Sequence, residues 1–87
     1  MLFHITYEFP PDHRDAAQER FKQTGGLPPE DVKMIGRWHC AEGHSGFIVA
    51  DADNPVSICK WIQEWTDLLS FQITPVLTDE QIMEVLL

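Results

Sequence analysis

Apolar and polar side chains alternate strictly near the start of the chain, from residue 3 to residue 9. The apolar positions are Phe3, Ile5, Tyr7 and Phe9, and the polar positions are His4, Thr6 and Glu8. Because successive side chains of a strand point to opposite faces, the alternation predicts a strand over residues 2–9 that is buried on one face only. A chain built on such a strand needs further strands beside it and a second layer over its apolar face.

Three further segments are predicted to be strands, over residues 33–40, 45–52 and 70–77. The run 47–50 is apolar at every position, which is expected of a strand that is central in its sheet or covered on both faces. Pro75 cannot donate a hydrogen bond to a neighbouring strand. It therefore places the last strand at a sheet edge or marks the end of that strand.

The first helix is predicted over residues 12–24. Asp12 is expected to cap its N-terminus, and Gly25 with Gly26 to stop it. Its apolar stripe is narrow, so the helix is expected to lie on the sheet through small residues and to keep its charged side in water. The stripe consists of Ala16, Ala17 and Phe21.

A second helix is predicted over residues 55–67. It follows Asp53-Asn54-Pro55, which is a side-chain cap and then a proline at the first helical position, where the missing N–H costs nothing. Apolar residues repeat along this helix at helical spacing and predict a broad buried side that supplies most of the packing on the sheet. They are Ile58, Trp61, Ile62, Trp65 and Leu69.

The remaining segments connect these elements or follow them. Residues 25–31 contain two glycines and two prolines and predict a loop anchored by Leu27, and residues 41–44 fit a hairpin turn with Gly43 at positive φ. Thr78-Asp79-Glu80-Gln81 fits a capping box that opens a short apolar helix. A helix of this length is not stable alone in water, so it is expected to dock on its own sheet or on a partner.

The order β-α-β-β-α-β predicts an α+β fold, the ferredoxin-like sandwich, in which a four-stranded antiparallel sheet carries helices on one face and is followed here by the short terminal helix. Eighty-seven residues are expected to form one domain, 1–87, with a thin core. The uncovered sheet face needs a partner surface. We therefore expect a homodimer that packs through the sheet faces, with Ile35, Ile48 and Val76 on the uncovered face.

The charge balance excludes several classes of partner. Fourteen Asp and Glu stand against six Lys and Arg, which gives a formal net charge of −8. Binding to nucleic acid or to an anionic membrane depends on Lys and Arg, so we expect neither partner. The first six residues lack the features of a signal peptide, and no apolar stretch approaches the ~20 residues of a membrane helix. A cytoplasmic protein is expected.

The cysteines and histidines do not form a recognisable metal motif. Cys40 and Cys59 are too few for a disulfide scaffold and are expected to be buried free thiols. His39, Cys40, His44 and His4 would be the candidate zinc ligands, but neighbouring strand residues point to opposite faces, and no Cys-x-x-Cys or His-Glu-x-x-His spacing is present. We expect neither a metal nor another cofactor.

The best candidate site lies in the strand 33–40, which contains no acidic residue and carries Arg37 and His39 two positions apart. Arg37 and His39 therefore share one strand face, and His4 and Thr6 share a face of the first strand. If these faces coincide, an imidazole pair, a cation and a hydroxyl would bind a small carboxylate or phenolate, or transfer a proton near neutral pH. In the alternative, the same side chains satisfy one another across a dimer interface.

The same alternation places Met34 and Trp38 on the other face, under the helices. Arg37 is then expected to matter more for ligand binding than for folding. The large aromatic residues fit either an aromatic cleft or an ordinary core. They include Tyr7, Trp38, Trp61 and Trp65.

Three segments, Phe3–Tyr7, Gly36–His39 and Trp61–Leu69, resemble a family of small bacterial proteins known only as a domain of unknown function. The resemblance covers nearly the whole chain. It implies the fold of the dimeric α+β barrels, whose subunits pack their sheets face to face and whose relatives include small monooxygenases and isomerases. That superfamily shares no catalytic residue, so the resemblance assigns no role to a numbered residue here.

Two functions follow from the sequence. One is an enzyme or binding module for a small anionic or aromatic ligand, held by His4, Thr6, Arg37 and His39. The other is a non-catalytic dimeric interaction protein, because the chain contains no Gly-rich phosphate loop and no Ser/His/Asp or Cys/His set with a known spacing. A cavity on the polar face would favour the first function, and tightly paired side chains would favour the second.

Overall fold

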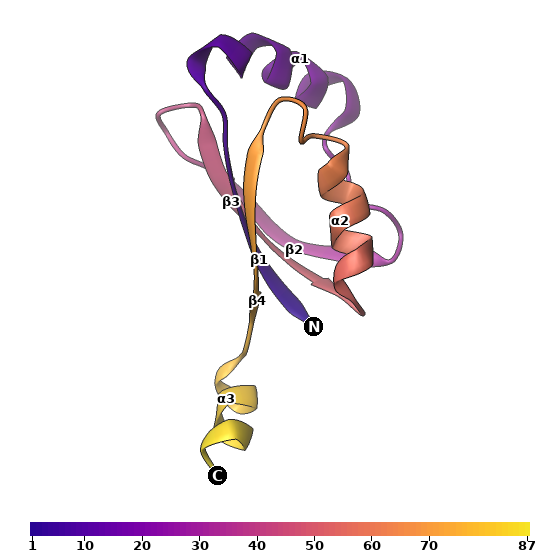
Figure 1. Ribbon diagram of the computed structural model, residues 1–87, viewed down its shortest axis with the longest axis vertical. Coiled ribbons are helices and arrows are strands. Elements are labelled where there is room, and N and C mark those ends of the chain that lie inside the picture. Colours follow the sequence, from indigo (N-terminus) through magenta and orange to yellow (C-terminus); the bar gives the residue numbers. More distant parts are fainter.

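A computed structural model describes residues 1–87 and contains one four-stranded sheet. The strands are β1 (Leu2–Glu8), β2 (Val32–His39), β3 (Ser45–Ala52) and β4 (Ser70–Val76). They are arranged in the order β2-β3-β1-β4, and every neighbouring pair is antiparallel (Figure 1). The apolar strand β3 is central, and β4, which contains Pro75, is an edge strand, as the sequence predicts.

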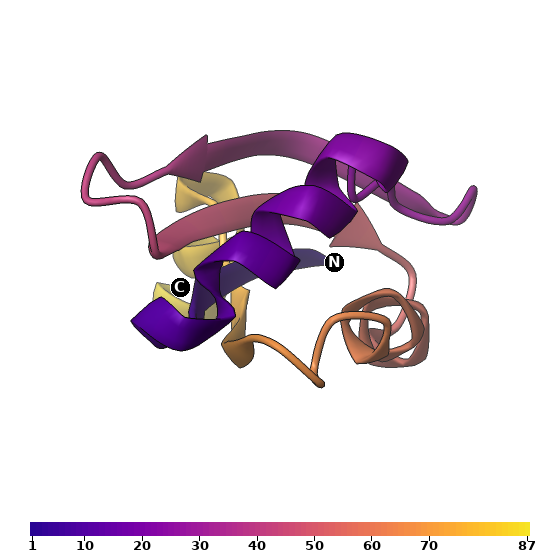
Figure 2. The same cartoon turned by 90° about the horizontal axis from the view of Figure 1, so that it is seen from above.

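The helices are η1 (Pro11–His13), α1 (Arg14–Thr24), α2 (Pro55–Gln63) and α3 (Asp79–Leu86). With the strands, they give the predicted order β-α-β-β-α-β and a terminal helix, so the α+β class is confirmed and the order agrees with a ferredoxin-like arrangement. Seen from above, α2 is viewed nearly end-on while α1 lies across the view, so the two helix axes are steeply crossed (Figure 2).

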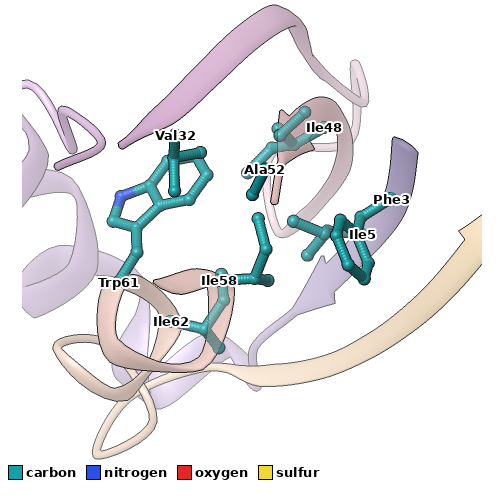
Figure 3. Packing of buried hydrophobic residues seen from close by; sticks show 9 residues of the cluster. Phe3, Ile5, Val32, Ile48, Ala52, Ile58, Trp61 and Ile62 are labelled. Atoms are coloured by element: carbon teal, nitrogen blue, oxygen red, sulfur yellow. The ribbon is translucent and has the colours of Figure 1, made fainter. Parts of the chain in front are cut away.

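The core lies between α2 and one face of the sheet, which we call the covered face (Figure 3). Its fully buried side chains Phe3 and Ile5 come from β1, and Ile58 comes from α2. Trp61 is 3% exposed and closes the same cluster. The predicted dominance of this helix in packing is confirmed, although Trp65 is only half-buried.

The helix α2 starts as predicted and ends earlier than predicted. The Asn54 side chain accepts hydrogen bonds from the backbone N–H groups of Val56 (2.9 Å) and Ser57 (3.4 Å), and Pro55 is the first helical residue. The helix ends at Gln63 rather than at residue 67, and residues 64–68 form turns. The apolar residues Trp65 and Leu69, which continue the helical spacing in the sequence, therefore lie in or just after these turns and not in the helix, and both line a pocket together with residues of the sheet.

The segment before α1 differs from the prediction. Pro11–His13 form a 3₁₀ turn, and no side chain caps it, so the predicted cap by Asp12 is wrong. The C-terminus agrees with the prediction, because Gly25 adopts the left-handed conformation at φ 70° and its N–H donates to the Phe21 carbonyl over 2.8 Å. Ala17 is the only buried residue of α1.

A bulge interrupts β2. Met34 stands opposite Ala50 and Gly36 stands opposite Val49, so Ile35 is an extra residue with no partner on β3. A single inserted residue reverses the faces on which all later side chains of the strand lie. The alternation read from the sequence therefore holds before Ile35 and fails after it.

Because of the bulge, Arg37 and His39 lie on the covered face, and Trp38 lies on the opposite face, which we call the open face. Trp38 is 50% exposed, so the prediction that it packs under the helices is wrong, whereas Met34 does pack against the core. Ile48 is buried on the covered face, which contradicts its predicted position on the other one.

Two further predictions about burial are wrong. Leu27 is 70% exposed and does not anchor its loop. Cys40 and Cys59 are free, as expected, but both are exposed. Gly43 has φ 95° in the hairpin turn, as predicted.

The helix α3 stands clear of the sheet beyond the end of β4 (Figure 1), and none of its residues is buried. The predicted capping box is present, because the Thr78 hydroxyl accepts from the Gln81 N–H (3.1 Å) and the Gln81 side chain accepts from the Thr78 N–H (2.9 Å). The helix does not dock on its own sheet. None of the helices has both the length and the apolar character needed to cross a membrane.

Candidate functional site

A cleft of about 390 Å³ lies on the covered face, between the sheet, α1 and the α2 segment with its following turns. Most of the residues that line it are hydrophobic. Six Phe, Tyr and Trp rings line it, namely Tyr7, Phe9, Phe21, Trp61, Trp65 and Phe71. A concave, largely apolar site with few polar groups is the usual form of a small-molecule site.

The cleft exists because α1 buries almost nothing. Ala17 is too small to fill the space above the sheet, and the Phe21 ring is partly exposed at the side of the cleft. Hydrophobic packing therefore contributes little to the attachment of α1 to the sheet. Polar contacts made by three side chains hold it instead.

Arg20 makes the first of these contacts. Its guanidinium donates to both carboxylate oxygens of Asp67, over 2.8 and 2.7 Å, and to the Glu64 carbonyl over 2.9 Å. It also lies over the Trp65 ring, 5.3 Å from the centroid. The hydrogen bond from Arg20 lowers the pKa of Asp67, so the carboxylate stays charged near neutral pH. Arg20 thus joins α1 to the turns after α2.

His13, just before α1, makes the second contact. Its Nδ1 lies 2.9 Å from the Leu68 carbonyl oxygen, so this nitrogen carries the proton and donates. The contact fixes the start of α1 to the same turns that Arg20 holds.

Arg37 makes the third contact, at the other end of α1. It donates through Nη1 to the Gly26 carbonyl and through Nη2 to the Gly25 carbonyl, both over 2.8 Å, and its guanidinium lies 4.8 Å from the Phe21 ring centroid. A cation at a helix C-terminus satisfies carbonyl groups that have no partner in the helix. Burial lowers the pKa of Arg37, but an arginine stays charged at neutral pH.

Tyr7 and His39 form the polar pair of the cleft. The Tyr7 hydroxyl lies 2.6 Å from His39 Nδ1, and both residues line the cleft, with His39 at its exposed rim. Burial raises the pKa of Tyr7, and burial together with the Arg37 charge lowers the pKa of His39. Both groups are therefore neutral near pH 7, and the pair offers a ligand one hydrogen-bond donor and one acceptor.

Gly46 makes this pair geometrically possible. It lies on β3 between the two residues, opposite Tyr7 on β1 and opposite His39 on β2. A Cβ at this position would lie 2.6 Å from the Tyr7 hydroxyl oxygen and closer still to the ring. The absence of a side chain lets Tyr7 lean across β3 to reach His39.

The structure separates the four predicted site residues into two groups. Arg37 and His39 lie at the cleft, whereas His4 and Thr6 lie on the open face, where the His4 ring is 5.7 Å from the Phe47 ring. The two polar faces do not coincide, because the bulge in β2 turns one of them over. Arg37 is also committed to two backbone carbonyls.

Sequence reasoning missed the main polar partner of His39, which is Tyr7. The alternation does place Tyr7 on the covered side with Phe3 and Ile5, and Gly46 in the middle of a strand signals a close approach. The alternation alone does not predict that Tyr7 and His39 meet, because His39 lies on the covered face only as a result of the bulge in β2.

No three His, Cys, Asp or Glu side chains converge in a way that could hold a metal ion. Among the candidate zinc ligands, His44 instead lies 3.9 Å from a Glu42 carboxylate oxygen in the hairpin turn.

No curated protein matches this chain. The family described as Domain of unknown function (DUF3303) matches it from residue 1 to residue 87, and the chain therefore belongs to that family.

Proposed function

We propose that this protein binds a small, neutral aromatic molecule in the cleft between α1, α2 and the sheet, as a homodimer with the architecture of the dimeric α+β barrels. The observation that carries the first part is the combination of six Phe, Tyr and Trp rings with one polar pair, Tyr7 and His39. The rings supply apolar contact area for the ligand, and the hydrogen bonds of the pair fix its orientation.

The chemistry of the pair favours a phenol or a similar hydroxyl compound. A neutral His39 next to a neutral Tyr7 can accept one hydrogen bond and donate another, which matches a hydroxyl group. A neutral His39 can also accept a proton from a bound hydroxyl group, so the pair offers a general base as well as a binding contact.

A carboxylate is a poorer candidate for the cleft. The half-buried cation at the cleft, Arg37, already donates to two carbonyl oxygens, and the chain as a whole has a net charge of −8. Lys22 at the cleft is exposed and has water as a competing partner. Of the anionic and aromatic ligands predicted from the sequence, the aromatic class is therefore the better match.

The test uses three ligands that share a methylphenyl ring and differ in the group opposite the methyl: p-cresol has a hydroxyl, p-toluate a carboxylate and toluene only hydrogen. Each is titrated into ¹⁵N-labelled protein, and binding is followed by NMR. We expect p-cresol to bind most tightly and to shift the resonances of cleft residues. Tyr7→Phe should weaken p-cresol binding about 2- to 10-fold and leave toluene binding unchanged, because it removes one neutral hydrogen bond.

Thr6→Val is the matched control, since Thr6 is the neighbour of Tyr7 on β1 but lies on the open face. It should leave all three affinities unchanged. Tightest binding of p-toluate, or equal p-cresol binding by the Tyr7→Phe variant, would reject the proposed ligand class.

The open face supports the homodimer. It exposes Trp38 (50%) and Phe47 (37%), whose rings stack with a centroid distance of 5.2 Å, on a sheet whose other face is covered. Large exposed aromatic pairs of this kind are typical of protein interfaces. Sedimentation velocity at micromolar concentration should give a dimer, and a monomer at that concentration would refute this part of the proposal.

A further inference from the structure

The helix α3 is amphipathic but has nothing to pack against. Its apolar residues are Ile82, Met83, Val85 and Leu86, and all are exposed. Glu80 and Glu84, one turn apart, lie away from Ile82 and Leu86 on the helix. Such a helix is suited to an apolar surface on one side and water on the other.

The helix is also too short to be stable by itself. Its capping box satisfies the N-terminus, but eight residues are below the length at which helices persist alone in water. Its own subunit gives it no surface, because Figure 1 shows it beyond the end of β4, away from the sheet and from the other helices. A second molecule is needed to cover it.

The open face also has no cover, and on it apolar side chains stand among polar ones such as His4 and Thr6. Its large apolar side chains are Leu2, Trp38, Phe47, Val49 and Val76. Trp38 and Phe47 stand opposite Thr6, about four residues or roughly 13 Å along the sheet from the Leu2–Val76 pair, where α3 begins. The most exposed aromatic pair and α3 thus lie toward opposite ends of the same face.

Contact area favours a face-to-face dimer that includes α3. Four strands about 4.8 Å apart and about seven residues long give each face a flat footprint of roughly 450 Å², or roughly 900 Å² for the two faces together. A helix about 12 Å long and 10 Å wide, packed on each copy, raises the total footprint to roughly 1,400 Å². The two helices thus enlarge the contact by about half and bring it toward the size of stable interfaces.

We propose that α3 is an arm exchanged between two copies of this chain. A two-fold axis that lies between the two sheets and runs diagonally to the strands brings the α3 corner of one sheet, at the end of β4, over the Trp38–Phe47 corner of the other, on β2 and β3. Ile82, Met83 and Leu86 of each copy then pack on Trp38 and Phe47 of the second copy. This inference rests on the proposed homodimer and is independent of the proposed ligand.

The first test compares variants of α3 by sedimentation velocity. Ile82→Glu combined with Leu86→Glu should raise the dimer dissociation constant at least tenfold, and Trp38→Ala should do the same. Glu84→Gln, on the other side of α3, is the matched control and should leave the constant unchanged. The circular dichroism of the dissociated variants should lose no more than the helical signal of the eight α3 residues, because the substituted residues are exposed and the sheet, α1 and α2 stay intact.

The second test uses the native thiol of Cys40, which lies two residues after Trp38 and is exposed. In a Cys59→Ser background, Leu86→Cys should form a disulfide-linked dimer under mild oxidation. Adding Cys40→Ser should abolish that link. A disulfide within one monomer would mean that α3 folds back on its own sheet, and it would overturn the exchange.

The outcomes separate this inference from the homodimer itself. A wild-type monomer would refute both. A wild-type dimer that survives Ile82→Glu with Leu86→Glu would refute the exchanged arm and leave the sheet-face dimer standing. A dimer that is lost in this variant and in Trp38→Ala, and is linked through Cys40, supports both.

Discussion

The helices α1 and α2 cover the same face of one sheet, but different interactions attach them. The helix α2 places Ile58, Trp61 and Ile62 in the core, and its N-terminus is capped by Asn54. The helix α1 buries only Ala17 and is attached by polar contacts at both ends. Apolar packing of α2 on the sheet therefore forms the core, whereas the polar attachment of α1 leaves space for the cleft between α1 and the sheet.

The difference has an energetic side. Burying large apolar side chains contributes several kcal/mol, whereas exposed ion pairs contribute little to global stability. Arg20 and Asp67 are therefore expected to set the position of α1 rather than the stability of the domain. The following variants test that division, beginning with the side chain expected to matter most.

Trp61→Ala should lower the free energy of unfolding by ~3 to 5 kcal/mol, because it empties the centre of the α2–sheet contact. Phe21→Ala in α1 is the matched control and should lower it much less, since that ring is 37% exposed. Urea denaturation followed by circular dichroism measures both. Equal losses would show that α1 is packed as firmly as α2.

Arg37→Ala should have the next largest effect. It leaves the carbonyls of Gly25 and Gly26 without their donors and removes a charge-assisted contact worth ~1.5 to 3 kcal/mol. This reverses the expectation from the sequence, in which Arg37 serves a ligand more than the fold. Arg37→Lys keeps the charge but cannot reach both carbonyls in a fork, so it should fall between the wild type and Arg37→Ala.

An unchanged urea midpoint for Arg37→Ala would mean that the contact at the end of α1 does not stabilise the fold. If Arg37→Ala lowers both the urea midpoint and the affinity for p-cresol, the cleft depends on the position of α1.

The sequence determined the elements better than it determined their faces. Local chemistry predicted the Asn54 cap, the Thr78 capping box and the edge position of Pro75, because each depends on residues close together in the chain. The face of Arg37 depends on whether an extra residue is present in β2. Gly36 is the local sign of a bulge, because glycine within a strand often marks one, but it also fits a regular strand and so does not determine the register. A one-residue register change is decided by packing across the sheet.

The end of α2 shows the same limit. Trp65 continues the helical spacing of Trp61, so the pattern predicts a longer helix. The chain turns instead after Gln63, and Trp65 lies at the cleft beneath Arg20 from α1. The contact between Arg20 and Trp65 joins segments that are far apart in sequence, and the periodicity of the apolar residues cannot predict such a contact.

A smaller effect is expected from pH. The folded protein holds the pKa of His39 below its ordinary value of about 6.5, so the unfolded chain binds the proton first as pH falls. The contribution of neutral His39 to the free energy of unfolding is then fully present above about pH 6.5 and is lost as pH falls below that value. Urea midpoints between pH 7.5 and 5 should decrease in the wild type and decrease less in His39→Asn. Parallel curves would show that His39 has no part in the pH dependence.

The smallest global effect is expected at Arg20, where the contrast between the two helices is sharpest. Arg20→Gln removes the double contact with Asp67 but empties no core, so the urea midpoint should stay close to that of the wild type. Local opening is a different quantity, because it depends on what attaches α1 rather than on the whole domain. Amide hydrogen exchange in α1 should become roughly two- to fivefold faster, while exchange in α2 stays unchanged. Lys22→Gln, which removes a charge of the same sign from the same helix and breaks no hydrogen bond or ion pair, should change neither rate. Faster exchange in both helices would mean that α1 and α2 open together, and the separate attachment of α1 would then have to be abandoned.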